Sequence, residues 1–212
     1  MKAQLIIFAA LLSLLSSCKK EKTEPICTPA PQEDYFPNKA GSYWTYQWYS
    51  IDSNGVETAF GSLDSIYISG DTSINNQSYT IYKGRKLGNN NYTSLLRDSS
   101  GYIVSPQGFI HYSYTNFTDT LQQGVSAPWN WYLKMFQESL DLFGATKEAL
   151  KARTYYYDPS GNPINNCGDT YFTFNSWYVS GIGKVKETNA FANQLQNCGL
   201  LEARLVSYHI GE

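Results

Sequence analysis

The chain has 212 residues and a formal net charge of −2, and it contains 18 tyrosines, 10 phenylalanines and 5 tryptophans. A chain without an excess of basic residues has little to neutralise phosphates, so no nucleic-acid partner is predicted. The length suits one domain with a substantial core, and the heavy aromatic content favours strands.

The first 17 residues, 1–17, have the layout of a signal peptide. Lys2 gives a positive start, and residues 5–15 form an uncharged apolar run that is short for a membrane span. The stretch Leu15-Ser16-Ser17-Cys18 resembles the lipobox of bacterial lipoproteins, which implies cleavage before the cysteine and lipidation of Cys18. We therefore predict a cell-envelope protein held on a membrane through the lipid on Cys18, as an outer-membrane lipoprotein facing the periplasm or the cell surface. The alternative is an ordinary signal peptide with a chance cysteine.

Residues 18–34 mix charged residues with prolines, a composition that cannot bury a core, so we predict a disordered or extended tether. The domain is predicted to span residues 35–212. Thiols outside the cytoplasm tend to pair, and Cys167 and Cys198 both lie in Asn-Cys-Gly contexts beside predicted strands, which favours a disulfide between them. A bridge from Cys27 that pins the tether to the domain is the alternative. No cysteine has the spacing of a metal site.

The opening strand of the domain is predicted near residues 42–49, where Trp44, Tyr46 and Trp48 alternate on one face. Further strand-like segments are separated by turn sequences, which is typical of an antiparallel meander. These segments are 63–69, 78–86, 92–97, 102–104, 109–114, 153–157, 170–179, 183–188 and 200–208.

Four turns share a pattern in which Asp or Ser comes first and Gly comes fourth. The first side chain can cap a type I turn, and the glycine supplies the positive φ that closes a hairpin. The two Asp-Ser sequences, at residues 52–55 and 98–101, are interpreted as turns rather than calcium loops, since they offer too few oxygen ligands. The four are Asp52-Ser53-Asn54-Gly55, Asp98-Ser99-Ser100-Gly101, Ser105-Pro106-Gln107-Gly108 and Asp158-Pro159-Ser160-Gly161.

One segment breaks the strand pattern. From residue 129 to 143, apolar and aromatic residues recur at spacings of three and four, which predicts an amphipathic helix with Gly144 as its stop, and residues 146–152 are interpreted as a shorter helical piece. The predicted fold is mainly β with a minor α part. It has a single antiparallel meander sheet, curled or two-layered as in an open barrel or a sandwich, with the helix packed on its apolar face.

Two stretches carry a family resemblance. Tyr35-Phe36-Pro37, Gly41 and Tyr43-Trp44 resemble the opening of small Bacteroidota-type cell-envelope lipoproteins. Gly181-Ile182-Gly183-Lys184-Val185 is similar to a strand near the end of the same proteins, with Lys184 in place of their usual apolar residue. The resemblance implies a shared β fold and no particular activity, because none is attached to that family.

No catalytic motif is found, so no enzyme activity, cofactor or metal is predicted. We interpret His111 and His209 as unrelated surface or half-buried residues, and the carboxylates of Asp64, Glu187 and Glu202 as solvent-facing charges.

Aromatic residues are the candidate ligand-binding groups. Trp129, Trp131, Tyr132 and Trp177 exceed what one buried face needs, and exposed rings suit sugars, peptides or lipid tails. We predict a non-enzymatic binding or interaction module for a glycan or protein. The alternatives are a carrier of a hydrophobic ligand held between sheet and helix, and a hydrolase with an unrecognised site.

Two short motifs suggest modification. Asp64-Ser65-Ile66 and Asp119-Thr120-Leu121 resemble the Asp-Ser/Thr-aliphatic sites that envelope proteins of this bacterial group use for O-glycosylation. The resemblance implies glycans on Ser65 and Thr120.

Overall fold

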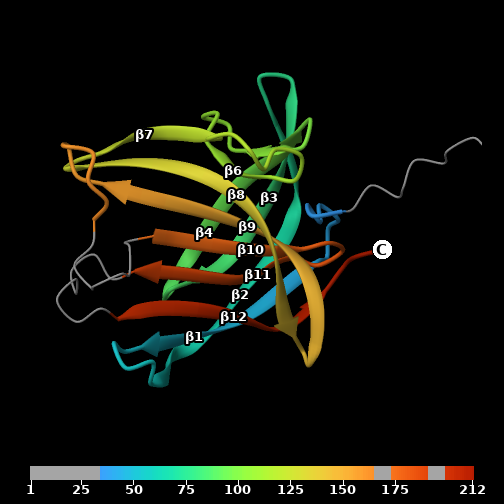
Figure 1. Ribbon diagram of the computed structural model, residues 1–212. Helices are drawn as coiled ribbons and strands as arrows, with labels where there is room; N and C mark the ends of the chain where they lie inside the picture. Colours follow the sequence, from blue (N-terminus) through green and yellow to red (C-terminus); the bar gives the residue numbers. More distant parts are fainter. Residues whose placement is uncertain (1–33, 165–172, 191–198) are drawn as a thin grey trace, which may run out of the picture. The chain divides into compact units, whose positions relative to one another are not determined.

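Figure 1 shows the computed structural model, which describes residues 34–164, 173–190 and 199–212, all within one compact unit, Glu33–Glu212. These residues form strands and no helix. The strands are β1 (Tyr43–Ile51), β2 (Glu57–Ile74), β3 (Gln77–Lys86), β4 (Asn89–Ser99), β5 (Tyr102–Val104), β6 (Ile110–Ser113), β7 (Gln122–Ser126), β8 (Trp129–Leu142), β9 (Ala145–Tyr157), β10 (Thr173–Val179), β11 (Gly183–Ala190) and β12 (Leu200–His209).

All the strands belong to one sheet, in the order β6-β5-β4-β3-β2-β1-β12-β11-β10-β9-β8-β7, with antiparallel neighbours. Strands β1 to β6 form one meander and strands β7 to β12 form a second. The pairing of β1 with β12 joins them, for example at Trp48 and Ala203. The predicted antiparallel sheet is therefore confirmed.

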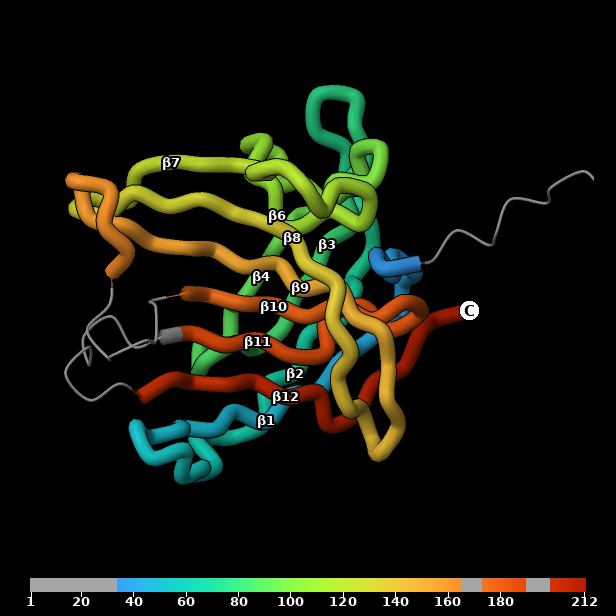
Figure 2. Tube along the Cα trace, viewed as in Figure 1, coloured from blue at the N-terminus to red at the C-terminus, as the bar shows by residue number. Residues whose placement is uncertain are grey.

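The sheet curls until its two ends approach each other. In Figures 1 and 2 the strands from β7 to β1 cross the front of the view, and β2, β3 and β4 pass behind them. At the seam between the ends, the backbone N–H of Ile110 on β6 donates to Oε1 of Gln122 on β7 at 2.7 Å. The rings of Phe109 and Trp131 lie 5.4 Å apart beside it. The result is a nearly closed, barrel-like sheet.

The interior is filled by the residues that alternate along each strand. Trp44, Tyr46 and Trp48 on β1 are all buried, as their predicted shared face requires. A second cluster around Ile103, Met135 and further apolar side chains fills the part nearer to the seam. Burial of these aromatic and aliphatic side chains is the main source of stability for the curled sheet.

The predicted helix at 129–143 is wrong, because these residues form β8, paired with β9 along its length. The same residues also fit a strand alternation, in which Leu133 and Met135 point inward and are buried. The aromatic residues of this segment favour a strand as well. Gly144, predicted as a helix stop, lies in the β8–β9 hairpin turn with Phe143, at φ values of +77° and +55°. Residues 146–152, interpreted as helical, belong to β9.

Three of the four predicted turns are confirmed, with Gly55, Gly108 and Gly161 at positive φ and hydrogen bonded to the first residue of each turn. The fourth differs, since Ser100 and Gly101 both have positive φ in a two-residue turn between β4 and β5. Asp98 still caps this turn by accepting a hydrogen bond from the Gly101 N–H at 2.8 Å. The short strand β7 was not predicted.

Candidate ligand-binding cavity

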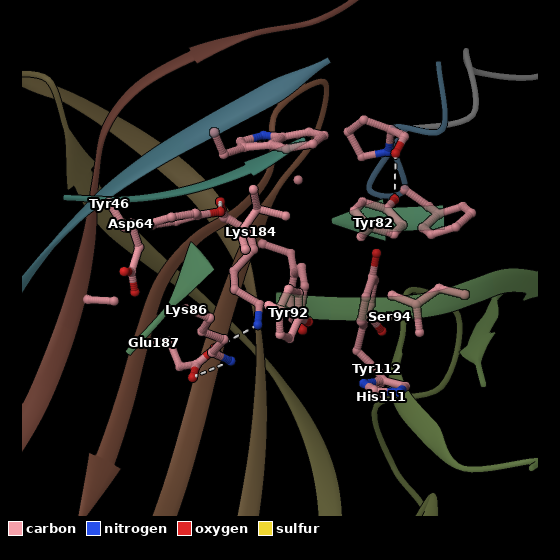
Figure 3. Close-up of a pocket in the computed structure, with 18 of the residues that line it drawn as sticks. Tyr46, Asp64, Tyr82, Lys86, Tyr92, Ser94, His111, Tyr112, Lys184 and Glu187 are labelled. Atoms are coloured by element: carbon pink, nitrogen blue, oxygen red, sulfur yellow. Dashed lines mark hydrogen bonds and ion pairs between the residues drawn. The ribbon is translucent and has the colours of Figure 1, made fainter. Parts of the chain in front are cut away.

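A cavity of about 110 Å³ lies inside the curled sheet. Its walls come from residues 35–37 and from the inner faces of β1 to β4, β6 and β10 to β12. Figure 3 shows side chains from these strands pointing into a shared space. Both meanders contribute to the lining, so the cavity exists only because the sheet curls.

Aromatic rings form one part of the wall. The Tyr82 ring lies 6.1 Å from the rings of both Phe36 and Trp44, and Tyr112 stacks on Tyr178 with ring centroids 3.7 Å apart. Rings of this kind give a cavity an apolar surface suited to a ring or a short acyl chain.

The hydroxyl groups of two of these tyrosines hold the start of the domain in place. Tyr82 donates to the carbonyl oxygen of Pro37 at 2.6 Å, and Tyr112 donates to that of Tyr35 at 2.8 Å. Burial raises the pKa of both phenols well above the usual value, so they remain protonated donors. The segment before β1 is thus fastened to the cavity wall.

The opposite part of the wall is charged. Nζ of Lys184 lies 2.7 Å from Oε2 of Glu187, and Nζ of Lys86 lies 2.8 Å from Oε1 of the same carboxylate. Glu187 is 8% exposed, whereas about a third of each lysine side chain reaches solvent. Two ammonium groups therefore share one buried carboxylate, as Figure 3 shows.

The pKa values follow from this arrangement. Burial alone would raise the pKa of Glu187, but Lys184 and Lys86 together hold it far below its ordinary value. Burial likewise acts to lower the pKa of Lys184, and Glu187 more than offsets this, leaving that pKa well above normal. Glu187 and Lys184 are thus both charged at neutral pH.

A second carboxylate, Asp64, is 2% exposed at the edge of the cavity. Its Oδ2 accepts hydrogen bonds at 2.6 Å from Nε1 of Trp48 and from the backbone N–H of Leu87. Nε of Arg85 lies 3.5 Å from Oδ1, is buried, and makes no hydrogen bond with the described residues. This Arg85 donor is an unsatisfied polar atom at the cavity.

His111 lines the cavity from β6, next to Tyr112 and away from Glu187 in Figure 3. Burial, with the charges of Lys184 and Lys86, lowers the pKa of His111 to about 4, so the imidazole is neutral at pH 7. Within the described residues, no hydrogen bond joins His111 to a carboxylate, and the exposed His209 lies on a different strand.

The four aromatic residues predicted to bind ligand do not form one site. On β8, Trp131 packs in the interior cluster, and Trp129 contacts Tyr156 edge to face. Tyr132 directly follows Trp131 on the strand, so it faces the opposite side, the outside of the sheet. Trp177 is a strand away on β10 and is 6% exposed. None of the four lines the cavity.

The outer face of β8 and β9 instead carries a tyrosine array, formed by Tyr132, Tyr155 and Tyr157. Tyr132 stacks on Tyr155 at 4.9 Å and on Tyr157 at 5.2 Å between ring centroids. Lys134 and Arg153 flank the array, with their charges 5.7 Å from Tyr132 and 5.6 Å from Tyr155. Stacked, half-buried rings with flanking cations can contact sugars.

Trp177 lies in a charged environment on the same outer face. Its ring is contacted by the ammonium groups of Lys151 at 4.6 Å and Lys186 at 4.9 Å. Its Nε1 donates to Glu138, which also pairs with Lys151 at 3.1 Å. These contacts occupy the indole and make it part of a surface ion network.

The predicted modification sites have different positions in the structure. Ser65 on β2 and Thr120 between β6 and β7 are exposed, while Asp64 beside Ser65 is buried. Cys18, Cys27, Cys167 and Cys198 lie outside the described residues, so the lipid anchor and the disulfide stay predictions.

The carboxylates interpreted as solvent-facing are buried: Asp64, Glu187 and Glu202 are at most 8% exposed. Each is held by cations or hydrogen-bond donors, which explains their burial. Only Lys184 could have indicated this buried charged site from the sequence, because it stands where the similar strand of the small cell-envelope lipoproteins has an apolar residue. A charge at an inward-facing strand position marks a polar group inside the sheet.

Within the described residues, no helix is long and apolar enough to span a membrane, and no group of three or more His, Cys, Asp or Glu side chains is placed to bind a metal. Comparison of the chain with protein-family models, with curated proteins and with solved structures finds no match.

Proposed function

We propose that this chain is a lipid-anchored envelope protein that binds a small amphipathic molecule inside its curled sheet and does not transform it. The observation that carries the proposal is the cavity, which combines aromatic rings such as Tyr82 and Tyr112 with the charged trio Lys86, Lys184 and Glu187. Such a mixture of an apolar surface and a few convergent polar groups is typical of ligand sites.

The size of the cavity limits the ligand. Drug-sized sites measure roughly 300–1,000 Å³, whereas an apolar cavity of about 150 Å³ holds one benzene molecule. At about 110 Å³, the cavity suits a single ring or a short acyl chain. This reading favours the carrier interpretation of the sequence, with the ligand inside the sheet itself rather than between sheet and helix.

The anchor on Cys18 and the tether of residues 18–34 place this site at a membrane surface. The support for both is the lipobox-like sequence Leu15-Ser16-Ser17-Cys18. Stable anchoring needs two acyl chains or their equivalent, which lipoprotein processing provides. Mass spectrometry of the N-terminal peptide tests the anchor, since an unmodified Cys18 would refute it.

Native mass spectrometry of the full chain, extracted from its own envelope in mild detergent, tests ligand binding. We expect an adduct that is lost on denaturation. Ser94 lines the cavity and Thr93 beside it on β4 is exposed, so Ser94→Trp should remove the adduct and Thr93→Trp should keep it. An adduct that survives Ser94→Trp, or no adduct in the wild type, would contradict the proposal.

The tyrosine array favours a second candidate function, binding of a glycan on the outer face. Its rings stack beside the cations Lys134 and Arg153, an arrangement suited to the faces and hydroxyl groups of sugars. A glycan array probed with the wild type and with Tyr155→Ala tests it. Binding that is absent, or unchanged in Tyr155→Ala, would remove this candidate.

A further inference from the structure

The charged trio in the cavity does not balance. Lys86 and Lys184 share the single carboxylate of Glu187, while Arg85 faces Asp64 at 3.5 Å. Among the described lining residues, three cations therefore stand against two carboxylates, and His111 is neutral. One positive charge remains uncompensated beside the aromatic wall.

The donors at this end of the cavity are also incompletely used. An ammonium group has three N–H donors, and Glu187 is the only hydrogen-bond acceptor of Lys184 Nζ and Lys86 Nζ among the described residues. The buried Nε of Arg85 also makes no hydrogen bond with any described residue. Unused donors on charged groups beside an apolar wall attract a negatively charged oxygen.

We infer that the cavity takes a monocarboxylate, with its carboxylate at Lys86 and Lys184 and its apolar body against the rings of Tyr82 and Tyr112. The inference rests on the proposed function and specifies the ligand class for the same cavity. A single negative charge matches the single uncompensated positive charge, whereas a doubly charged phosphate would leave the cavity negative. The cavity size admits a body of about one six-membered ring.

Three probes of nearly equal shape separate charge from size: benzoate, benzamide and benzamidine. Each is titrated into the full chain at neutral pH and followed by ligand-observed NMR. We expect benzoate to bind at least about tenfold more tightly than benzamide, and benzamidine not to bind, because its positive charge meets two lysines.

Two lysines on the same strand make a matched pair of variants. Lys86 lines the cavity, whereas Lys83 on β3 is exposed. Lys86→Met should remove the preference for benzoate over benzamide, and Lys83→Met should retain it. Glu187→Gln removes the competing carboxylate and should tighten benzoate binding, an opposite change that loss of folding cannot imitate.

The outcomes distinguish the inference from the proposed function. Equal binding of benzoate and benzamide, both abolished by Ser94→Trp, would overturn the monocarboxylate inference and leave the cavity as a binding site. A preference for benzoate that survives Lys86→Met would also overturn it. If none of the three probes binds, the inference is wrong, and the native adduct alone then decides the proposed function. Tighter binding of phenyl phosphate than of benzoate would overturn the inference too, because the cavity would then prefer a dianion to a monocarboxylate.

Discussion

Burial of single titratable side chains inside this sheet changes their pKa values and so makes stability depend on pH. His111 is the clearest case, because the pKa of its imidazole falls from 6.5 to about 4 through burial and the neighbouring lysines. The unfolded chain therefore binds a proton in a pH range in which the folded chain does not.

Acid therefore destabilises the folded state through His111. The contribution of His111 to the free energy of unfolding is fully present above pH 6.5 and is lost as the pH falls to about 4, a change of up to about 3 kcal/mol. Urea unfolding of wild type and His111→Gln across this range should show a steeper loss in the wild type. His209→Gln, at an exposed site, should keep the wild-type slope; equal slopes for all three proteins would contradict the prediction.

Asp64 is expected to be important for stability rather than for binding alone. Asp64→Asn replaces an acceptor that serves Trp48 Nε1 and the Leu87 N–H, and it places an amide donor near one of these donors. We expect a loss of about 1–3 kcal/mol in the free energy of unfolding, measured by urea denaturation. Asp71→Asn, at an exposed position on the same strand, should change it by less than about 0.5 kcal/mol.

Among the elements, the hairpin turns show where local sequence and backbone disagree. Leu87 and Gly88 connect β3 to β4 with φ values of +48° and +78°, and Leu87 is exposed. The turn between β2 and β3 has the same shape with Asn75 and Asn76, at +50° and +60°. Asparagine tolerates this conformation and leucine does not, so the β3–β4 turn carries avoidable strain.

Substitutions at Leu87 and Asn75 test how much this backbone strain lowers the free energy of unfolding. Leu87→Asn should raise the free energy of unfolding by roughly 0.5–1 kcal/mol, because the backbone N–H bonded to Asp64 is retained. The reverse change at the equivalent position, Asn75→Leu, should lower it by about 1 kcal/mol. Thermal denaturation of both variants measures the two shifts, and a destabilising Leu87→Asn would show that the leucine side chain matters here.

Strand β8 shows why element prediction failed at one place. Its sequence satisfies both a three-to-four spacing and an alternation, and no local residue decides between them. Pairing with β9 decides, since Tyr132 lies opposite Tyr155 and Met135 opposite Ala152. The partner strand, and not the β8 segment by itself, therefore sets the structure here, whereas β1 and the turns at Gly55 and Gly161 follow from local sequence.

For the whole molecule, the seam between β6 and β7 is the weak line of the sheet. Side-chain contacts such as Gln122 to the Ile110 N–H bridge it in place of a regular strand ladder. Amide protons of β6 and β7 should therefore exchange faster than those of β1 and β12, which have partners on both sides. Equal protection across the sheet would contradict this expectation.

A substitution at the seam gives a local test. Gln122→Ala removes the acceptor for the Ile110 N–H and should lower the protection free energy of that amide by about 1 kcal/mol, measured by hydrogen exchange with NMR detection. Gln123→Ala, at the exposed neighbouring position on β7, should leave it unchanged.

At this scale the sequence predicts the antiparallel sheet, because alternation and turn chemistry are local. It does not predict the cavity, because Lys86, Lys184 and His111 are far apart in the chain and meet only through the curl of the sheet. The aromatic residues that the sequence singled out, such as Trp131 and Trp177, turn out to be core and network residues. Residue type alone cannot separate these roles.

The segment of residues 35–37 has a mechanical consequence. It follows the predicted tether in the chain, and it is also part of the cavity wall, held by hydrogen bonds from the hydroxyls of Tyr82 and Tyr112. If residues 18–34 form the tether that the sequence predicts, a pull along them acts on the hydrogen bond from the Gly181 N–H to the Asp34 carbonyl oxygen and then on these two hydrogen bonds, before it loads the β1–β12 ladder. Force on the chain before residue 34 would thus reach the cavity wall before it reaches the strand ladders of the sheet.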